Sequence, residues 1–217
     1  MKDKKLPLVL AAVDLCIFKI VDGVLCVYLV KNNNELYKNL LCIPGSLIGL
    51  NESTEDALAR IAKEKTSLNI KSIYKEQLYS FSGINRDKRS RAISVAYLCL
   101  YSGNEVEGFV DISKIKKLAY DHSQILKFAL ERLKSKLEYT TIVQKLIKNS
   151  FTFSELQKTY EVIFGREIDK RNFRKKIDSL NILQETGNKI QSGKMRPAKE
   201  YAFVSDEVNS FKLFGEM

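Results

Sequence analysis

Apolar runs separated by short polar loops dominate the first two thirds of the chain. These runs predict β-strands at residues 8–13, 15–18, 24–30, 40–43, 74–81 and 92–101. Asp22 and Gly23 stand between two of the runs, and this dipeptide favours the tight turn of a β-hairpin. A short helix or turn is expected at residues 111–117.

Two amphipathic segments predict helices among these strands. The first helix opens at Ser53, whose hydroxyl can cap a helix and which is followed by acidic residues in the first turn. The second, longer helix begins near Asp121 or Ser123 and continues to about Leu137. Strands that alternate with helices in this way indicate an α/β arrangement for this part of the chain.

The pattern changes at Tyr139. Three helical segments follow at residues 141–147, 154–164 and 169–180, and Gly165 is a suitable end for the second of them. Two short strands, at 182–187 and 199–204, enclose a basic loop. Three helices followed by a β-hairpin is the order of a winged helix-turn-helix, so we expect a domain boundary near Glu138.

The distribution of charge along the chain indicates a polyanionic binding partner. The net formal charge of the 217-residue chain is +10, which alone is a weak indication because basic proteins are common. Between residues 139 and 196, however, there are 12 basic and 6 acidic residues, and five of the seven residues from 170 to 176 are basic. A cluster of this kind suits contact with the phosphate backbone of DNA.

Cysteine usage and the lack of long apolar runs exclude several other classes of protein. The four cysteines lie in strand-like stretches without metal-ligand spacing, so we expect buried, reduced thiols at Cys16, Cys26, Cys42 and Cys99. The only histidine is His122, so cysteine–histidine catalysis has a single candidate base. Neither a membrane span nor a signal peptide is expected, which favours the cytoplasm.

Residues 44–68 resemble the signature of the Nudix family: Gly, five residues, Glu, seven residues, then Arg-Glu-apolar-any-Glu-Glu-any-Gly-apolar. Glu52, Arg60 and Glu64 match this pattern, whereas Ser46, Ile61, Lys65 and Ser67 replace two glycines and two glutamates. Nudix enzymes hydrolyse nucleoside diphosphate derivatives with divalent cations held by carboxylates of this helix. Since Ile61 and Lys65 cannot act as metal ligands, we expect no catalytic residues, no metal or other cofactor, and no enzyme activity.

Other segments resemble, in order, the Nudix-related transcriptional regulators of the NrtR type. They are the loop and strand at 81–97, the helix start at 118–122, and residues 151–161, 169–176 and 196–198. Lys88 departs from the proline of the family's RDPR loop. The resemblance spans about residues 7–204. It implies an α+β fold: a Nudix α/β/α sandwich with a mixed sheet over 1–138, then a smaller winged helix-turn-helix domain over 139–217.

The resemblance also implies a function. Members of this family are homodimeric bacterial regulators, usually repressors, whose Nudix domain no longer hydrolyses but binds a small effector. The effector is ADP-ribose in regulators of NAD metabolism, whereas relatives in some bacteria control sugar catabolism, and the sequence does not choose between the two. The helix from about Asp121 to Leu137 leads into the second domain, so we expect it to couple effector binding to DNA binding.

Candidate binding residues follow from these two parts. For DNA contact we expect Lys170, Arg171, Asn172, Arg174, Lys175 and Lys176 on the second winged-helix segment, with Lys189, Lys194 and Arg196 in the wing. For the effector we expect Arg86, Arg89 and Arg91 as a phosphate-binding cluster, together with Glu52 and Glu64 of the degenerate box. We expect a structural role for His122 and core positions for Tyr28, Tyr79 and Tyr97.

Each of these groups of candidate residues also has an interpretation without a binding role. The basic helix face can be merely solvated, the wing can be an unstructured polar hairpin, and the arginine loop can be a salt-bridged or dimer-forming surface. Two other functions also stay open. One is an active Nudix hydrolase with an accessory winged helix, which Ile61 and Lys65 argue against. The other is a winged-helix interaction module that never contacts DNA, which the basic run at 170–176 argues against.

Overall fold

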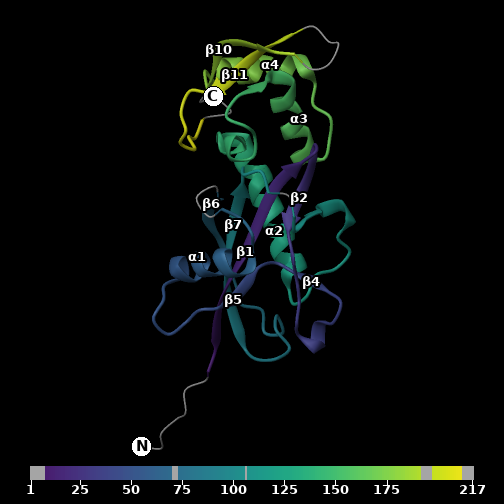
Figure 1. Cartoon of the computed structure of the whole chain (residues 1–217), viewed down its shortest axis with the longest axis vertical. Helices are drawn as coiled ribbons and strands as arrows, with labels where there is room; N and C mark the ends of the chain where they lie inside the picture. Colours follow the sequence, from purple (N-terminus) through teal and green to yellow (C-terminus); the bar gives the residue numbers. More distant parts are fainter. Residues whose placement is uncertain (1–7, 70–72, 106, 192–196, 212–217) are drawn as a thin grey trace, which may run out of the picture.

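The computed structural model describes residues 8–69, 73–105, 107–191 and 197–211. A unit built around one large sheet contains the first two thirds of the chain, and a smaller unit of helices and a β-hairpin lies at the far end of the molecule (Figure 1). Within the described ranges, every helix is too short or too polar to span a bilayer.

The central strand of the large sheet is β1 (Leu10–Val21). It runs parallel to β7 (Ala92–Tyr101) and antiparallel to β2 (Val24–Tyr28) and to the short β5 (Gly45–Leu47). The strands β6 (Ile73–Phe81) and β8 (Phe109–Asp111) complete the order β6-β7-β1-β2-β8. The sheet is therefore mixed, as predicted.

Two predictions about the strand β1 have different outcomes. The division into strands at 8–13 and 15–18 is wrong, because Asp14 stays in register with Ala96 of β7 and β1 continues through it. The hairpin at Asp22-Gly23 is confirmed: Val21 pairs with Val24, and both turn residues have positive φ angles, 48° and 76°. Positive φ at both central positions is typical of the tight turns that join twisted antiparallel strands.

Short elements flank this sheet. The strands β3 (Val30–Lys31) and β4 (Leu41–Cys42) pair with each other, and a single 3₁₀ turn, η1 (Glu35–Tyr37), lies between them in sequence. The short helix or turn expected at 111–117 is the 3₁₀ turn η3 (Ile112–Lys114).

A helix covers each face of the large sheet. The helix α1 (Thr54–Lys65) begins with a reciprocal capping box between Ser53 and Asp56, as the Ser53 signal predicted, and buries its apolar face in a cluster with β1 and β7. The longer helix α2 (His122–Tyr139) packs on the opposite face through Ile125, Ala129, Leu133 and Leu137. The predicted α/β/α sandwich is confirmed.

The last third of the chain forms a winged helix. Its elements are η4 (Ile142–Lys145), β9 (Phe151–Thr152), α3 (Phe153–Phe164), α4 (Lys170–Ser179), β10 (Leu183–Ile190) and β11 (Ala198–Phe203). The strands form a sheet in the order β10-β11-β9. The first of the three expected helices is wrong in extent: only a 3₁₀ turn forms, and its residues Ile142 and Val143 pack into the core.

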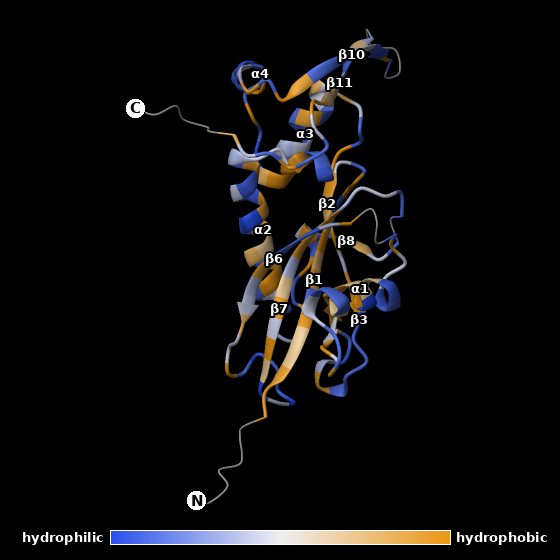
Figure 2. Cartoon of the chain, turned by 90° about the vertical axis from the view of Figure 1, so that its left-hand side faces the viewer, coloured by the Kyte–Doolittle hydropathy of each residue, from blue (hydrophilic) through white to orange (hydrophobic). Residues whose placement is uncertain are grey.

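One continuous apolar core joins the two units. It extends from Leu29 and Leu118 beside the large sheet, through Leu133 of α2, to Leu156 of α3 and Phe173 of α4. Figure 2 shows the hydrophobic colouring concentrated in the strands β1 and β7, while α1 and α4 are mostly hydrophilic. The helix α2 itself ends at Tyr139, next to the boundary that the sequence predicts at Glu138.

All four cysteines are buried and unpaired, as predicted. Burial raises the pKa of the Cys99 thiol to about 12 and that of Cys42 to about 11. These thiols stay protonated near neutral pH and behave as small apolar side chains rather than as nucleophiles.

Candidate functional site

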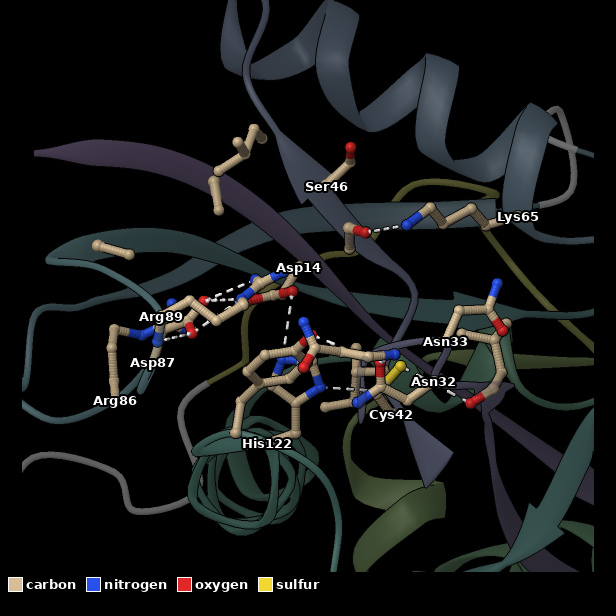
Figure 3. Close-up of a pocket in the computed structure, with 18 of the residues that line it drawn as sticks. Asp14, Asn32, Asn33, Cys42, Ser46, Lys65, Arg86, Asp87, Arg89 and His122 are labelled. Carbon is tan, nitrogen blue, oxygen red and sulfur yellow. Dashed lines mark hydrogen bonds and ion pairs between the residues drawn. The ribbon is translucent and has the colours of Figure 1, made fainter. Parts of the chain in front are cut away.

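A cavity of about 710 Å³ opens beside the sheet of the large unit. Its wall is built from the first half of β1, the segment 30–34, β5, the end of α1, the loop 86–89 and the start of α2. Figure 3 shows Lys65 and Asn32 on one side of this space and Asp87 and Arg89 on the other, with Asp14 and His122 between them. Its volume is in the range typical of sites for small organic ligands.

A buried ion network forms the floor of the cavity. The guanidinium of Arg86 lies 2.8 Å from a carboxylate oxygen of Asp121 and 3.3 Å from one of Asp14. The Arg86 side chain is only 5% exposed, and the Ser94 hydroxyl donates a further hydrogen bond to Asp14 at 2.5 Å. Arg86 is thus committed to two carboxylates of its own chain and leaves little donor capacity for a bound phosphate.

His122 connects this network to the adjacent chain segment. Its Nδ1 accepts a hydrogen bond from the backbone N–H of Ile43 at 2.9 Å, and its Nε2 lies 3.5 Å from a carboxylate oxygen of Asp14. Burial lowers the pKa of His122, although Asp14 and Asp121 oppose this shift. The ring is therefore neutral with its proton on Nε2, and the contacts agree with the structural role expected for it.

The other two arginines of the predicted phosphate cluster lie apart from Arg86. Arg89 is at the rim of the cavity, where it makes a bidentate pair with Asp87 at 2.6–3.1 Å and stacks over the ring of Tyr120. Burial alone would raise the pKa of Asp87, but the hydrogen bonds from Arg89 outweigh it and lower the pKa below its usual value. Arg91 donates to backbone carbonyls of its own loop, outside the cavity wall. The three side chains do not converge on one point.

Lys65 reaches the cavity from the last turn of α1. Its ammonium group donates to the carbonyl oxygen of Gly45 on β5 at 2.5 Å. β5 lies so close to β1 here that a Cβ at position 45 would collide with the carboxylate of Asp14, and only glycine fits. The close approach of β5 therefore sets the position of Lys65 at the cavity wall.

Most of the polar wall of this cavity could not be predicted from the sequence. Asp14 is a lone charge inside an apolar run, which is a recognisable signal for a buried functional or structural group, but its partner Arg86 is 72 residues away in sequence. Lys31 ends the strand β3 and Asn32 follows it, in a polar stretch of sequence that contains no recognisable motif. Only the fold brings these residues together.

The residues of the degenerate Nudix box are engaged with one another. Arg60 donates to Glu52 at 2.5 Å and 3.0 Å and to Glu64 at 3.3 Å. The hydrogen bonds from Arg60 and from the backbone N–H of Gly49 lower the pKa of Glu52 to about 2. Neither glutamate is on the wall of the 710 Å³ cavity.

The divalent cation that a Nudix box implies does not fit these residues. Ile61 is fully buried in the core cluster under α1, and Lys65 presents a cation where an anionic ligand would be needed. In the part of the chain that the structure describes, no three His, Cys, Asp or Glu side chains are grouped closely enough to hold a metal ion.

The second candidate site is the outer face of α4. Asp169 caps this helix, and Phe173 and Ile177 point into the core of the winged helix. The predicted DNA-contacting residues of this helix are all exposed: Lys170, Arg171, Asn172, Arg174, Lys175 and Lys176. The amphipathic interpretation of the basic run thus agrees with the burial pattern.

Arg174 differs from its neighbours because it bends back onto its own domain. Its guanidinium donates to the hydroxyl of Tyr201 at 2.9 Å and lies 4.6 Å from the centroid of the Phe153 ring. It also lies 3.5 Å from Asp178. In the wing, Lys189 is exposed on β10, whereas the predicted contacts Lys194 and Arg196 lie outside the described residues.

Comparisons with known proteins agree with this architecture. The family model described as the NrtR DNA-binding winged helix domain matches residues 143–203. The ADPR-responsive transcriptional repressor NtrR of Acinetobacter baylyi is 32% identical over 212 residues, which are 91% of this chain and 83% of that protein. The ADP-ribose pyrophosphatase of Methanocaldococcus jannaschii is 31% identical over 119 residues, 49% of this chain and 69% of that enzyme.

Two solved structures are similar as well. Shewanella oneidensis NrtR complexed with a 27mer DNA is 29% identical, with a TM-score of 0.75 over 89% of this chain and 93% of that one. The Nudix domain of the same protein complexed with ADP ribose is 29% identical, with a TM-score of 0.52 over 61% of this chain and 94% of that one.

The fold and the two sites define a class of protein: a Nudix-type sandwich joined to a winged helix of the DNA-binding type. The similarity to the Acinetobacter repressor extends over both units. The chain belongs to the NrtR family of transcriptional regulators.

Proposed function

We propose that the protein is a transcriptional repressor that binds an operator through α4 and releases it when ADP-ribose enters the cavity of the Nudix-like domain. It acts as a homodimer on genes of NAD metabolism and does not hydrolyse its effector. The observation that carries the proposal is the exposed basic face of α4, since a relative of similar architecture was crystallised with DNA. ADP-ribose is supported by the names of two relatives.

The geometry of α4 supports particular roles on DNA. With Phe173 and Ile177 directed inward, Arg171 and Asn172 lie in the first turns of the helix, from which a recognition helix reads base edges. Asn pairs with adenine and Arg with guanine in the major groove. Lys170 and Lys175 suit phosphate contacts. Arg174 must first leave Tyr201 to reach a base, so its main role in this proposal is to hold α4 against β11.

Salt dependence tests the DNA contact. We expect the protein to bind its own upstream region, and the double variant Lys170→Ala/Lys175→Ala to lower the slope of log affinity against log salt by about 1 for each phosphate that is no longer neutralised. The control variant Lys63→Ala/Lys127→Ala removes the same charge from exposed positions on α1 and α2. Equal slopes for both variants, or no binding by the unmodified protein, would contradict the proposal.

The helix α2 supports the coupling of the two sites. Its start contributes His122 to the cavity, and the adjoining Asp121 pairs with Arg86. Its later turns pack in the core shared with α3 and α4. A ligand that shifts the start of α2 therefore acts on a helix that also supports the DNA-binding unit.

Effector identity is tested by titration of the protein–DNA complex. ADP-ribose is expected to weaken operator affinity by about 5- to 150-fold, the usual range of allosteric coupling. Arabinose is the comparison ligand, because sugar-responsive regulation is the other outcome that the family resemblance leaves open. Release by arabinose and not by ADP-ribose would reassign the effector while leaving the DNA-binding role intact.

A hydrolase is the second candidate function, and the similarity to an archaeal ADP-ribose pyrophosphatase favours it. Against it stand the buried Ile61 and the pairing of Glu52 and Glu64 with Arg60. Phosphate-release assays on ADP-ribose with Mg²⁺ or Mn²⁺ distinguish the two functions. If the protein hydrolysed ADP-ribose at the rates of ordinary enzymes, the Nudix-like domain would be a hydrolase and not only an effector sensor.

A further inference from the structure

The charged groups on the cavity wall do not balance. The described lining residues include four basic side chains, Lys31, Lys65, Arg86 and Arg89, but only two acidic ones, Asp14 and Asp87. Both acids are already satisfied, Asp14 by Arg86 and Ser94 and Asp87 by Arg89. Asp121, just outside the wall, also pairs with Arg86, so three carboxylates stand against four cations and the site keeps a net positive charge.

The cations without a carboxylate partner are two lysines. Among the described residues, neither Lys31 nor Lys65 has a carboxylate within ion-pair distance, and Lys65 donates only to the carbonyl of Gly45. An ammonium group offers three donors, so most of the capacity of Lys65 is unused. Lys65 approaches from α1 and Lys31 from β3, and the two cations border the same space.

The amide nitrogen of Asn32, the residue after Lys31, is also without a partner among the described residues. The Asn32 Oδ1 accepts hydrogen bonds from the N–H of Asn34 at 3.0 Å and from the hydroxyl of Tyr120 at 3.5 Å, which fixes the orientation of the amide. Its Nδ2 is buried and makes no hydrogen bond to any residue that the structure describes. A buried donor without an acceptor is costly, and a ligand oxygen in the cavity would remove that cost.

We propose that the cavity holds the diphosphate group of its effector without a divalent cation, with Lys65 and Lys31 supplying the positive charge and Asn32 an additional donor. The proposal rests on the proposed ADP-ribose effector and explains why its binding site needs no metal ligands. Ammonium–phosphate hydrogen bonds are charge-assisted, and two of them match the two negative charges of a diphosphate diester. In this proposal Lys65 binds the effector, in addition to replacing a carboxylate that would hold a metal ion.

Calorimetric titration of the full-length protein with ADP-ribose tests this assignment. The titration is made once in EDTA and once with Mg²⁺, and we expect the same affinity in both. Inorganic pyrophosphate should compete with ADP-ribose in EDTA, because it carries the group that the lysines recognise. Binding that appears only with Mg²⁺ would overturn the metal-free site while leaving ADP-ribose as the effector. An absence of binding under both conditions would instead overturn the proposed effector.

The variant Lys65→Met tests the named residue. It keeps the length of the side chain and removes the charge, so affinity for ADP-ribose in EDTA should fall by about 10- to 100-fold. Lys63→Met is the matched control, since Lys63 is exposed on the same helix but outside this cavity, and it should bind like the unmodified protein.

DNA affinity without effector reports whether each variant is folded, and it should be unchanged in both. Equal effector affinity of Lys65→Met and Lys63→Met would overturn the role of Lys65. If Lys65→Met also loses DNA binding, Lys65→Arg keeps the assignment testable, because it retains the charge and should restore metal-free effector binding.

Discussion

Arg86 shows how a residue chosen for its charge can have a different role once its surroundings are known. Its loop and its basic neighbours made it a phosphate-binding candidate, but its guanidinium is buried between Asp14 and Asp121. Removing one member of a buried charge network leaves the others without compensation, and this loss is usually larger than the net contribution of the whole network. Arg86 is therefore a stability determinant of the cavity floor.

The variant Arg86→Met is expected to lose about 3–5 kcal/mol of unfolding free energy, because the buried Asp14 and the mostly buried Asp121 lose their cation. Urea denaturation measures this loss. Adding Asp14→Asn to the same chain should recover part of it, since one of the uncompensated charges is then removed. The exposed Arg91→Met is the control, with an expected loss of about 1 kcal/mol or less. Equal losses for Arg86→Met and Arg91→Met would contradict the buried network.

His122 makes stability depend on pH in a predictable direction. Burial lowers its pKa from the usual 6.5, so the unfolded chain takes up a proton at a higher pH than the folded chain does. Stability should therefore fall as the pH drops below 6.5, with a slope of up to about 1.4 kcal/mol per pH unit.

Unfolding free energies measured from pH 7.5 down to about 5.5 test this slope. The chain has a single histidine, so His122→Asn removes the imidazole titration completely while its amide oxygen can still accept from Ile43. The variant should lose the slope near neutral pH and keep the steeper decline at acid pH that carboxylates cause. A variant with the slope of the unmodified protein would show that His122 is protonated equally in both states.

Tyr79 illustrates a limit of reading burial from sequence. Tyr28 and Tyr97 are buried as expected, but Tyr79 is 54% exposed. The strand β6 has a register shift between Gln77 and Tyr79, and such a bulge reverses which side of the strand the following residues face. The alternation of apolar residues could not indicate this shift, because it depends on the pairing with β7.

At the scale of elements, helix ends were predictable where capping chemistry is local. Ser53 for α1 and Gly165 for α3 were both recognised, and Gly165 has a φ of +70°. The segment at 141–147 failed because its conformation is set by packing: Ile142 and Val143 are fully buried, and the chain turns there instead of continuing a helix. Capping residues therefore predicted helix ends correctly, whereas a conformation that depends on tertiary packing could not be predicted from the local sequence.

Gly165 gives a quantitative test of the cap. Apart from the adjoining residues of the chain, no described atom lies within 4 Å of a Cβ built at this position, so Gly165→Ala costs only the strain of a left-handed backbone. The expected loss is about 1–2 kcal/mol of unfolding free energy. Gly165→Asn should lose less, because asparagine tolerates this conformation better. Equal stability of the alanine variant and the unmodified protein, measured by urea denaturation, would contradict the strain argument.

At the scale of the whole molecule, the shared core links the stability of the two units. Domains joined by a polar contact usually move and unfold separately, whereas a continuous apolar interface favours cooperation. Here Leu133 of α2 is fully buried in a cluster that also contains residues of α3 and α4. The fold class and the order of the two units were predictable from sequence, but their common core was not, because it depends on side chains distant in sequence.

The chain contains no tryptophan, so a single introduced tryptophan can report by its fluorescence on the unfolding of one unit. Phe109→Trp places a reporter in the large unit, and Phe164→Trp places one in the winged helix. We expect both reporters to give the same urea midpoint and slope. Leu133→Ala should lower both midpoints together, with a loss of about 2–5 kcal/mol. Separate transitions, or a loss confined to one reporter, would show that the units unfold independently.

The burial of Ile61 also limits which single substitutions could give this chain a metal site. A glutamate restored at position 61 alone would meet a closed apolar cluster and bring a charge into it without a partner. A glutamate at position 65 alone would find Glu52 and Glu64 already paired with Arg60, and it would remove a cation from the wall of the cavity. Each of these single substitutions is unfavourable by itself, so the packing around Ile61 makes it difficult for this chain to gain metal-dependent hydrolysis one residue at a time.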